Sequence, residues 1–196
     1  MITTFARNRM LDAIGVTHVS AHTAYSSTGA SEVTGGTPAY ARKAITYGAA
    51  SAEAKSATTQ PVLDIPAGTT VRFIGLWDAL TAGNFLGMIP NGGTEQEFAV
   101  DTTASTVKVP AHGWAATQKI VFIGDTPPAP LVEGTVYFVA GTVTTNTFQV
   151  SATSGGATIT LTAEPGRKCT VAAIVEEAFA SQGTLTVSSQ VVRLDA

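Results

Sequence analysis

Charged residues are scarce in this 196-residue chain: Asp, Glu, Lys and Arg together make up 13% of it, about half the usual share of a soluble domain. The polar surface must therefore come largely from Thr, Ser, Gln and Gly, residues that favour strands and tight turns over helices. The hydrophobic share of 44% is large enough to form a substantial core. We therefore expect an all-β fold.

Clusters of positive charge are also missing, since the eleven Lys and Arg residues are scattered singly and the formal net charge is −3. Binding to nucleic-acid phosphates requires clustered cations, so no nucleic-acid partner is expected. No apolar run approaches the ~18 residues of a membrane helix, and the amino terminus lacks the apolar core of a signal peptide. We expect synthesis in a cytoplasm and no insertion into a membrane.

Cysteine is nearly absent, because Cys169 is the only one in the chain. No intrachain disulfide can therefore form. A catalytic thiol would need a partnering histidine, and no motif supplies one. The residues around Cys169 have a strand pattern, so we interpret this cysteine as a small buried apolar residue.

Motifs for catalysis and metal binding are missing as well. His18 and His22 are the best candidate metal ligands, but on a strand they would lie about 13 Å apart, and we interpret them as partly exposed strand residues. His112 is predicted to lie in a turn. Glu176 and Glu177 would point to opposite faces of a strand, which argues against a joint acid–base role. The sequence predicts no enzyme, no metal and no cofactor.

The only good helix signal lies in the first fifteen residues. Thr3 or Thr4 can cap the helix and Gly15 can end it. Its predicted apolar stripe consists of Phe5, Met10, Leu11 and Ile14. A helix this short is marginal alone, so we expect the stripe to cover one end of a β-sandwich.

The residue composition and strand spacing of the sequence change near residue 101 and change back after residue 172. Between these points, short strand patterns alternate with turn signals every ~8–12 residues, as in a small sandwich or barrel. The simplest arrangement is a jelly-roll-like β-sandwich host domain, residues 1–100 and 173–196, with an inserted β-sandwich or barrel module at residues 101–172. Such an insertion costs little, because loop-closure entropy grows slowly with length.

Several motifs of the host segments occur in a specific order. They are Met10–Asp12 in the opening helix, Thr17–Thr23, Glu32–Gly36, Tyr40–Arg42, Ile65–Val71, Phe73–Ala79, Asn84–Gly87 and Val192–Asp195. In this order they resemble a group of small tailed-phage proteins described as tail-fibre proteins. The inserted segment separately resembles a β module of phage fibres and surface proteins, through Ala111–Trp114, Gly134–Val139, Asn146–Thr153 and Gly155–Gly156.

The two resemblances imply a non-enzymatic structural protein on the exterior of a tailed-phage virion, made in the cytoplasm of the bacterial host. The first hypothesis is a tail fibre or minor tail component whose host domain docks on the particle and whose inserted module projects outward. A capsid decoration protein on the major capsid lattice is the alternative, and a carbohydrate-binding receptor module is the second alternative. The expected partners are the tail or major capsid protein and further copies of the chain, with a trimer by family analogy.

Trp114 is the candidate for contact with a host-surface carbohydrate, because aromatic rings stack on sugars. Trp77, Tyr137 and Phe138 lie in strand patterns, where a core position is expected. Trp114 follows His112 and a glycine in a predicted loop, where its ring can be exposed.

Overall fold

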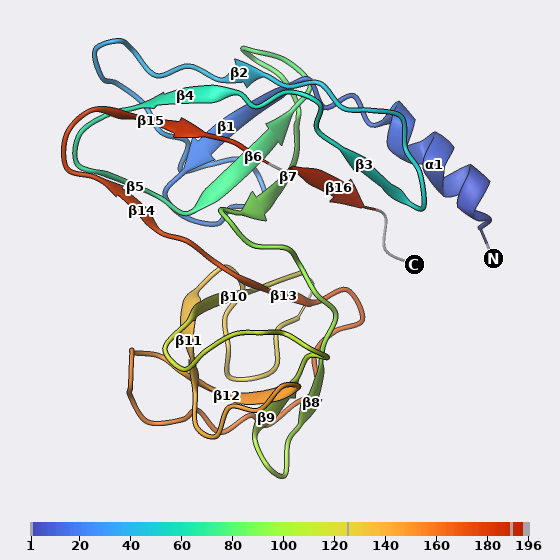
Figure 1. Cartoon of the computed structure of the whole chain (residues 1–196), viewed down its shortest axis with the longest axis vertical. Coiled ribbons are helices and arrows are strands. Elements are labelled where there is room, and N and C mark those ends of the chain that lie inside the picture. The colour runs from blue at the N-terminus through green and yellow to red at the C-terminus, as the bar shows by residue number, and fades with distance from the viewer. Residues whose placement is uncertain (1, 125, 189, 194–196) are drawn as a thin grey trace. The chain divides into compact units, whose positions relative to one another are not determined.

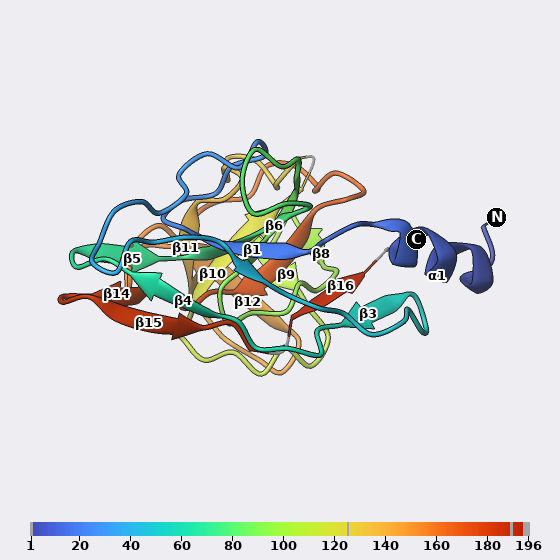
Figure 2. The ribbon, with the colours of Figure 1, turned by 90° about the horizontal axis from the view of Figure 1, so that it is seen from above.

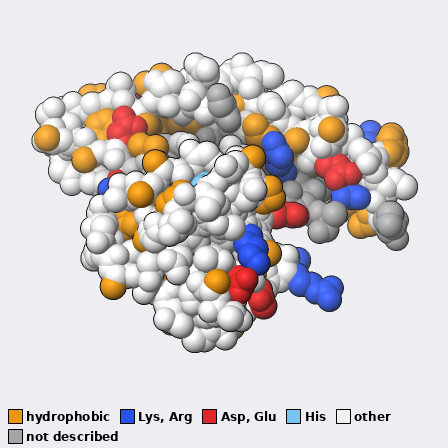
Figure 3. All heavy atoms as spheres, turned by 60° about the horizontal axis from the view of Figure 1, so that its bottom comes forward, with side chains coloured by type: hydrophobic (Ala, Val, Ile, Leu, Met, Phe, Trp, Pro, Cys, Tyr) orange, Lys and Arg blue, Asp and Glu red, His pale blue; other side chains and the backbone are white. Residues whose placement is uncertain are grey.

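The computed structural model describes the chain except residues 1, 125, 189 and 194–196. It divides into two compact units, of which the first comprises residues 1–88 and 177–196 and the second residues 89–176 (Figure 1). Strands make up 36% of the chain and helix 5%. The predicted all-β fold with one short helix is therefore confirmed. Few charged side chains are visible on the face shown in Figure 3, and most of that face is neutral.

A four-stranded sheet forms one part of the first unit. Its order is β2–β1–β6–β7, with β2 at Lys43–Ala44, β1 at His18–His22, β6 at Phe73–Trp77 and β7 at Phe85–Pro90. β1 and β6 pair antiparallel along their whole lengths, from His18 opposite Trp77 to His22 opposite Phe73. All five residues of β6 are buried, as strands covered on both faces require.

A two-stranded antiparallel ribbon forms the other part. Three early strands pair with the three last ones: β5 (Thr69–Val71) with β14 (Glu177–Phe179), β4 (Val62–Ile65) with β15 (Gly183–Thr186), and β3 (Ala54–Ser56) with β16 (Val191–Arg193). One register holds through the first two pairs and shifts by a single residue before the third. The segments before and after the second unit therefore run side by side (Figures 1 and 2).

Helix α1 spans Thr4–Ala13, and the Thr3 hydroxyl caps it by accepting a hydrogen bond from the Ala6 amide at 3.3 Å. The predicted apolar stripe is wrong, because Leu11 is the helix's one buried residue. The helix is attached by polar groups instead. Thr4 and Arg7 donate hydrogen bonds to the two carboxylate oxygens of Glu53 at 2.8 and 2.7 Å, and the Glu53 amide donates to the Asn8 side chain at 2.9 Å.

The second unit is built on a six-stranded sheet. In spatial order its strands are β13 (Thr170–Ala173), β10 (Lys119–Ile123), β11 (Val136–Ala140), β12 (Thr147–Ser151), β9 (Thr106–Lys108) and β8 (Ala99–Asp101). The sheet curls until its two edges approach, and Gln96, just before β8, exchanges two backbone hydrogen bonds with Val171 of β13 at 2.9 and 3.0 Å. This single bridge does not make a closed barrel.

The second unit begins before the change of residue composition at residue 101. β8 pairs with β9, and Val100 belongs to the same buried cluster as Phe122, Phe148 and Val171. Phe98 packs against this cluster. Strand pairing and core packing therefore extend the unit to residues 89–176, whereas composition alone placed its limits at 101 and 172.

Candidate functional site

The two histidines of β1 have different surroundings. His18 is half-buried, with Nδ1 2.9 Å from the Thr17 hydroxyl. His22 is fully buried, so the expectation of partial exposure is wrong for this residue. The Ala30 carbonyl and the Phe85 ring lie against its side chain, and β6 pairs along its strand. Among the described residues, no group of three or more His, Cys, Asp or Glu side chains is arranged to hold a metal ion.

His22 belongs to a buried chain of hydrogen bonds. Its Nδ1 lies 2.9 Å from the Ala30 carbonyl oxygen, and its Nε2 lies 2.6 Å from the Ser20 hydroxyl. A carbonyl only accepts, so Nδ1 carries the proton and Nε2 accepts from Ser20. The Ser20 oxygen in turn accepts from the Trp77 indole N–H at 2.7 Å. Burial lowers the pKa of His22, which favours this neutral form.

Ser20 and His22 have the separation of a nucleophile and its general base, but their surroundings leave no room for a substrate. Both side chains are fully buried. A Cβ atom at Gly75 would lie 2.4 Å from the Ser20 oxygen and 2.5 Å from His22 Nε2. The backbone of β6 therefore closes over the pair, and a hydrolytic role would need access that this packing denies. The pair stabilises the sheet.

A second polar cluster lies beside this chain. The guanidinium of Arg42 stacks on Trp77 and donates to both carboxylate oxygens of Glu32, with Nε–Oε1 at 3.0 Å and Nη2–Oε2 at 2.8 Å. The Tyr40 hydroxyl accepts from the Ala21 amide at 2.8 Å, and burial raises the pKa of Tyr40. Residues from four separate sequence motifs thus meet in one place. Sequence reasoning identified the motifs but not this meeting.

Three large apolar side chains are exposed in α1 or directly before it. Ile2, Phe5 and Met10 are 54%, 75% and 49% exposed, and we call these three residues the apolar surface of α1. The contacts of the helix with Glu53 come from Thr4, Arg7 and Asn8 instead. Exposed apolar groups of this size are typical of interaction surfaces.

The predicted carbohydrate contact, Trp114, is half-buried in the second unit. Its ring packs against Phe148 and His112 with centroid separations of 5.5 and 5.3 Å, and against the buried cluster. His112 lies in a turn between Ala111 and Gly113, which both have positive φ. The His112 ring is buried, and its Nδ1 accepts from the Trp114 amide at 2.9 Å. Trp114 is thus partly exposed, and its contact with a carbohydrate stays a prediction.

The other aromatic residues of the strands lie inside or at the edge of the core. Trp77 and Tyr137 are buried, and Phe138 is half-buried. Cys169 is buried directly before β13. Glu176 forms an ion pair with Lys119 in the second unit, whereas Glu177 is the first residue of β14 in the first unit.

In the described part of the chain, no helix is long and apolar enough to cross a membrane.

Comparison with known proteins addresses the first half of the chain. Residues 1–95 match the family described as Podophage GP4 fiber I protein gp80. This confirms the resemblance to tail-fibre proteins, whereas the resemblance of the inserted module to other phage modules stays a prediction. No match was found among curated proteins or among solved structures.

The fibre-family segment, residues 1–95, contains α1 and the strands β1 to β7. It also contains every residue of the two polar clusters and the apolar surface of α1. It ends soon after Met88, the last residue of the first unit before the chain enters the second. The family match therefore falls mainly in the first unit.

Proposed function

We propose that this chain is a non-enzymatic structural protein of a tailed-phage virion, exposed on the particle exterior as a tail fibre or minor tail component. The observation that carries the proposal is the match of residues 1–95 to a phage fibre family. The scarcity of charge is compatible with dense assembly, since near-neutral surfaces repel one another weakly.

We assign attachment to the first unit and outward projection to the second. The match ends near the point where the chain leaves the first unit, so what the family shares lies mainly there. The apolar surface of α1 supplies a contact area for a neighbouring tail protein or another copy of the chain. The second unit has its own core and its own sheet, as a separately folded projection requires.

The surroundings of four reactive side chains support a role without catalysis. The Ser20–His22 pair is closed off by the backbone at Gly75. The thiol of Cys169 is buried. The Glu176 carboxylate is engaged by Lys119. Assembly into homo-oligomers, with a trimer as the expected state, belongs to the same proposal.

The test is a cryo-EM reconstruction of the phage particle, with an antibody fragment raised against the second unit as a label. The proposal expects label and density at the tail, in a ring or in projecting fibres. Density repeated over the icosahedral lattice would favour capsid decoration and overturn the tail placement. Absence of the chain from purified particles by mass spectrometry would overturn the virion role.

A further inference from the structure

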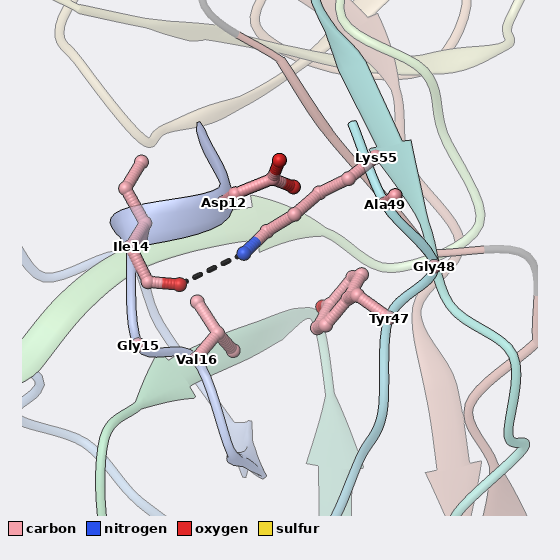
Figure 4. Close-up of a pocket in the computed structure, with 8 residues that line it drawn as sticks. All are labelled: Asp12, Ile14, Gly15, Val16, Tyr47, Gly48, Ala49 and Lys55. Atoms are coloured by element: carbon pink, nitrogen blue, oxygen red, sulfur yellow. Dashed lines mark hydrogen bonds between the residues drawn. The ribbon is translucent and has the colours of Figure 1, made fainter. Parts of the chain in front are cut away.

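A polar pocket of about 300 Å³ lies between the end of α1 and the segment 47–55 of the first unit (Figure 4). Val16 and Lys55 are buried in it, whereas Asp12 and Ala49 are exposed at its rim. The pocket therefore reaches the solvent on one side and the protein interior on the other. Its polar side chains, from Asp12, Tyr47 and Lys55, come from separate segments that line the same space.

The Lys55 ammonium is buried with few partners. The residue is 5% exposed, and its Nζ donates a hydrogen bond to the Ile14 carbonyl oxygen at 2.8 Å. Nζ also lies 5.2 Å from the centroid of the Tyr47 ring. An ammonium carries three N–H donors, and buried polar groups are costly unless they are hydrogen-bonded. Burial lowers the pKa of Lys55, and the nearby charge of Asp12 raises it. Because the bond to Ile14 uses one of the three donors, Lys55 can also donate to a group in the pocket.

The Tyr47 hydroxyl is a second available donor. It is buried, and it has no hydrogen-bond partner among the described residues. Burial raises the pKa of Tyr47 to about 12, so the hydroxyl keeps its proton at neutral pH. Native proteins leave few buried polar atoms unsatisfied, and each of them requires an explanation.

Asp12 supplies the acceptor on the opposite side. One of its carboxylate oxygens accepts from the Ala50 amide at 2.8 Å, and a carboxylate has further acceptor capacity. The pocket thus combines one positive and one negative charge. A ligand that is itself an anion would be attracted by Lys55 but repelled by Asp12. A hydroxyl group both donates and accepts, so adjacent hydroxyls satisfy Lys55, Tyr47 and Asp12 together.

We propose that this pocket binds a neutral polyhydroxyl ligand, a single pyranose sugar ring, through Asp12, Tyr47 and Lys55. Its volume lies at the lower end of the ~300–1,000 Å³ of small-molecule sites, which fits one ring better than a longer saccharide. The inference goes beyond attachment to the virion, and it places sugar recognition in the first unit in addition to the expected contact at Trp114. It does not depend on where the chain sits in a particle.

The test is an NMR titration of the full ¹⁵N-labelled chain with D-glucose, D-galactose and N-acetyl-D-glucosamine in turn. Saturable shifts of the amides of Gly15 and Gly48 are expected with at least one sugar. The dissociation constant should be on the order of millimolar, as the ligand efficiency of so small a molecule allows. Sodium acetate at the same concentrations is the anionic control, and it should cause no saturable shift of these amides.

Three substitutions connect binding to the proposed groups. Tyr47→Phe removes only the hydroxyl and should weaken binding ~2–10-fold, the value of one hydrogen bond. Asp12→Asn should weaken it by a similar factor, and Lys55→Met should abolish it. Lys168→Met, at an exposed residue of the second unit, is the matched control and should bind as the unaltered chain does. If Lys55→Met does not fold, the other two substitutions still decide the question.

Three outcomes would overturn the inference. They are the absence of saturable shifts with all three sugars, saturation by acetate instead of sugar, and unchanged sugar affinity in both Tyr47→Phe and Asp12→Asn. Because the titration uses the isolated chain, its result is separate from the localisation of the chain in phage particles. Failure of one proposal therefore cannot be mistaken for failure of the other.

Discussion

The guanidinium of Arg42 lies 3.3 Å from the centroid of the Trp77 ring, while the same group is held by the carboxylate of Glu32. Trp77 also donates its indole N–H to Ser20 inside the sheet. One aromatic ring therefore connects the long segment after β1 to the sheet. A stacked, bidentate arginine has a planar geometry that lysine does not reproduce.

Arg42→Lys should lower the free energy of unfolding by ~1–2 kcal/mol. It loses both the stacking on Trp77 and the bidentate hydrogen bonds to Glu32. Urea denaturation followed by circular dichroism measures the change. Arg9→Lys, on the exposed side of α1, is the matched control and should have almost no effect. Equal effects of the two substitutions would contradict the structural role of Arg42.

His22 should make stability depend on pH. Burial lowers its pKa below the ordinary value of 6.5, so the folded state binds the proton more weakly than the unfolded state. The stability contribution of neutral His22 is therefore complete above pH 6.5 and is lost as the pH falls through the folded-state pKa. Urea denaturation between pH 8 and 5 measures this dependence. His22→Gln should be less stable at pH 8 and show a flatter pH profile, and a parallel profile would contradict the assignment.

Deletion of the second unit should leave the first folded. Val175 and Asn91 are hydrogen-bonded neighbours, since the Val175 amide donates to the Asn91 carbonyl at 2.9 Å. A short Gly/Ser linker in place of residues 92–174 should therefore give a soluble protein with a cooperative thermal transition.

The comparison for this deletion is removal of residues 101–172, the limits suggested by composition. It leaves Phe98 and Val100 without the core against which they pack, so aggregation is expected. Static light scattering and thermal melts distinguish the two proteins. Aggregation of both would show that the first unit depends on the second.

Phe5→Ser should reduce incorporation into phage particles without lowering stability. The side chain is 75% exposed, so the change in unfolding free energy should stay within ~0.5 kcal/mol. Val132→Ser, at a residue 60% exposed in the second unit, is the control for loss of an exposed apolar group. Quantitative immunoblots of purified particles measure incorporation. Equal incorporation of Phe5→Ser and the unaltered chain would exclude the apolar surface of α1 as an attachment surface.

Local patterns predicted the parts of the fold that depend on local physics. The Thr3 cap, the short helix and the buried strand around Phe73–Trp77 follow from residue types and their spacing. The side of α1 that faces the protein does not, because it depends on Glu53, which follows Ala52 in a turn where both residues have positive φ. No periodicity within the helix contains that information.

The candidate site was less predictable for the same reason. Alternation along β1 places Ser20 and His22 on one face, but their burial depends on Gly75, which lies far away in the sequence. The pocket joins Asp12 to Lys55 only after α1 packs beside β3. Composition does not contain the start of the second unit either, because strand pairing by β8 begins before the composition changes.

The antiparallel ribbon of the first unit has a consequence for biosynthesis. Its early strands, β3 to β5, leave the ribosome before residues 89–176, and their partners β14 to β16 leave after them. At ~5–20 residues per second, the early strands wait several seconds for those partners. The second unit is continuous in sequence and can complete its core during this interval. The domain translated in the middle is therefore free to fold first, and the domain that contains the amino terminus is completed last.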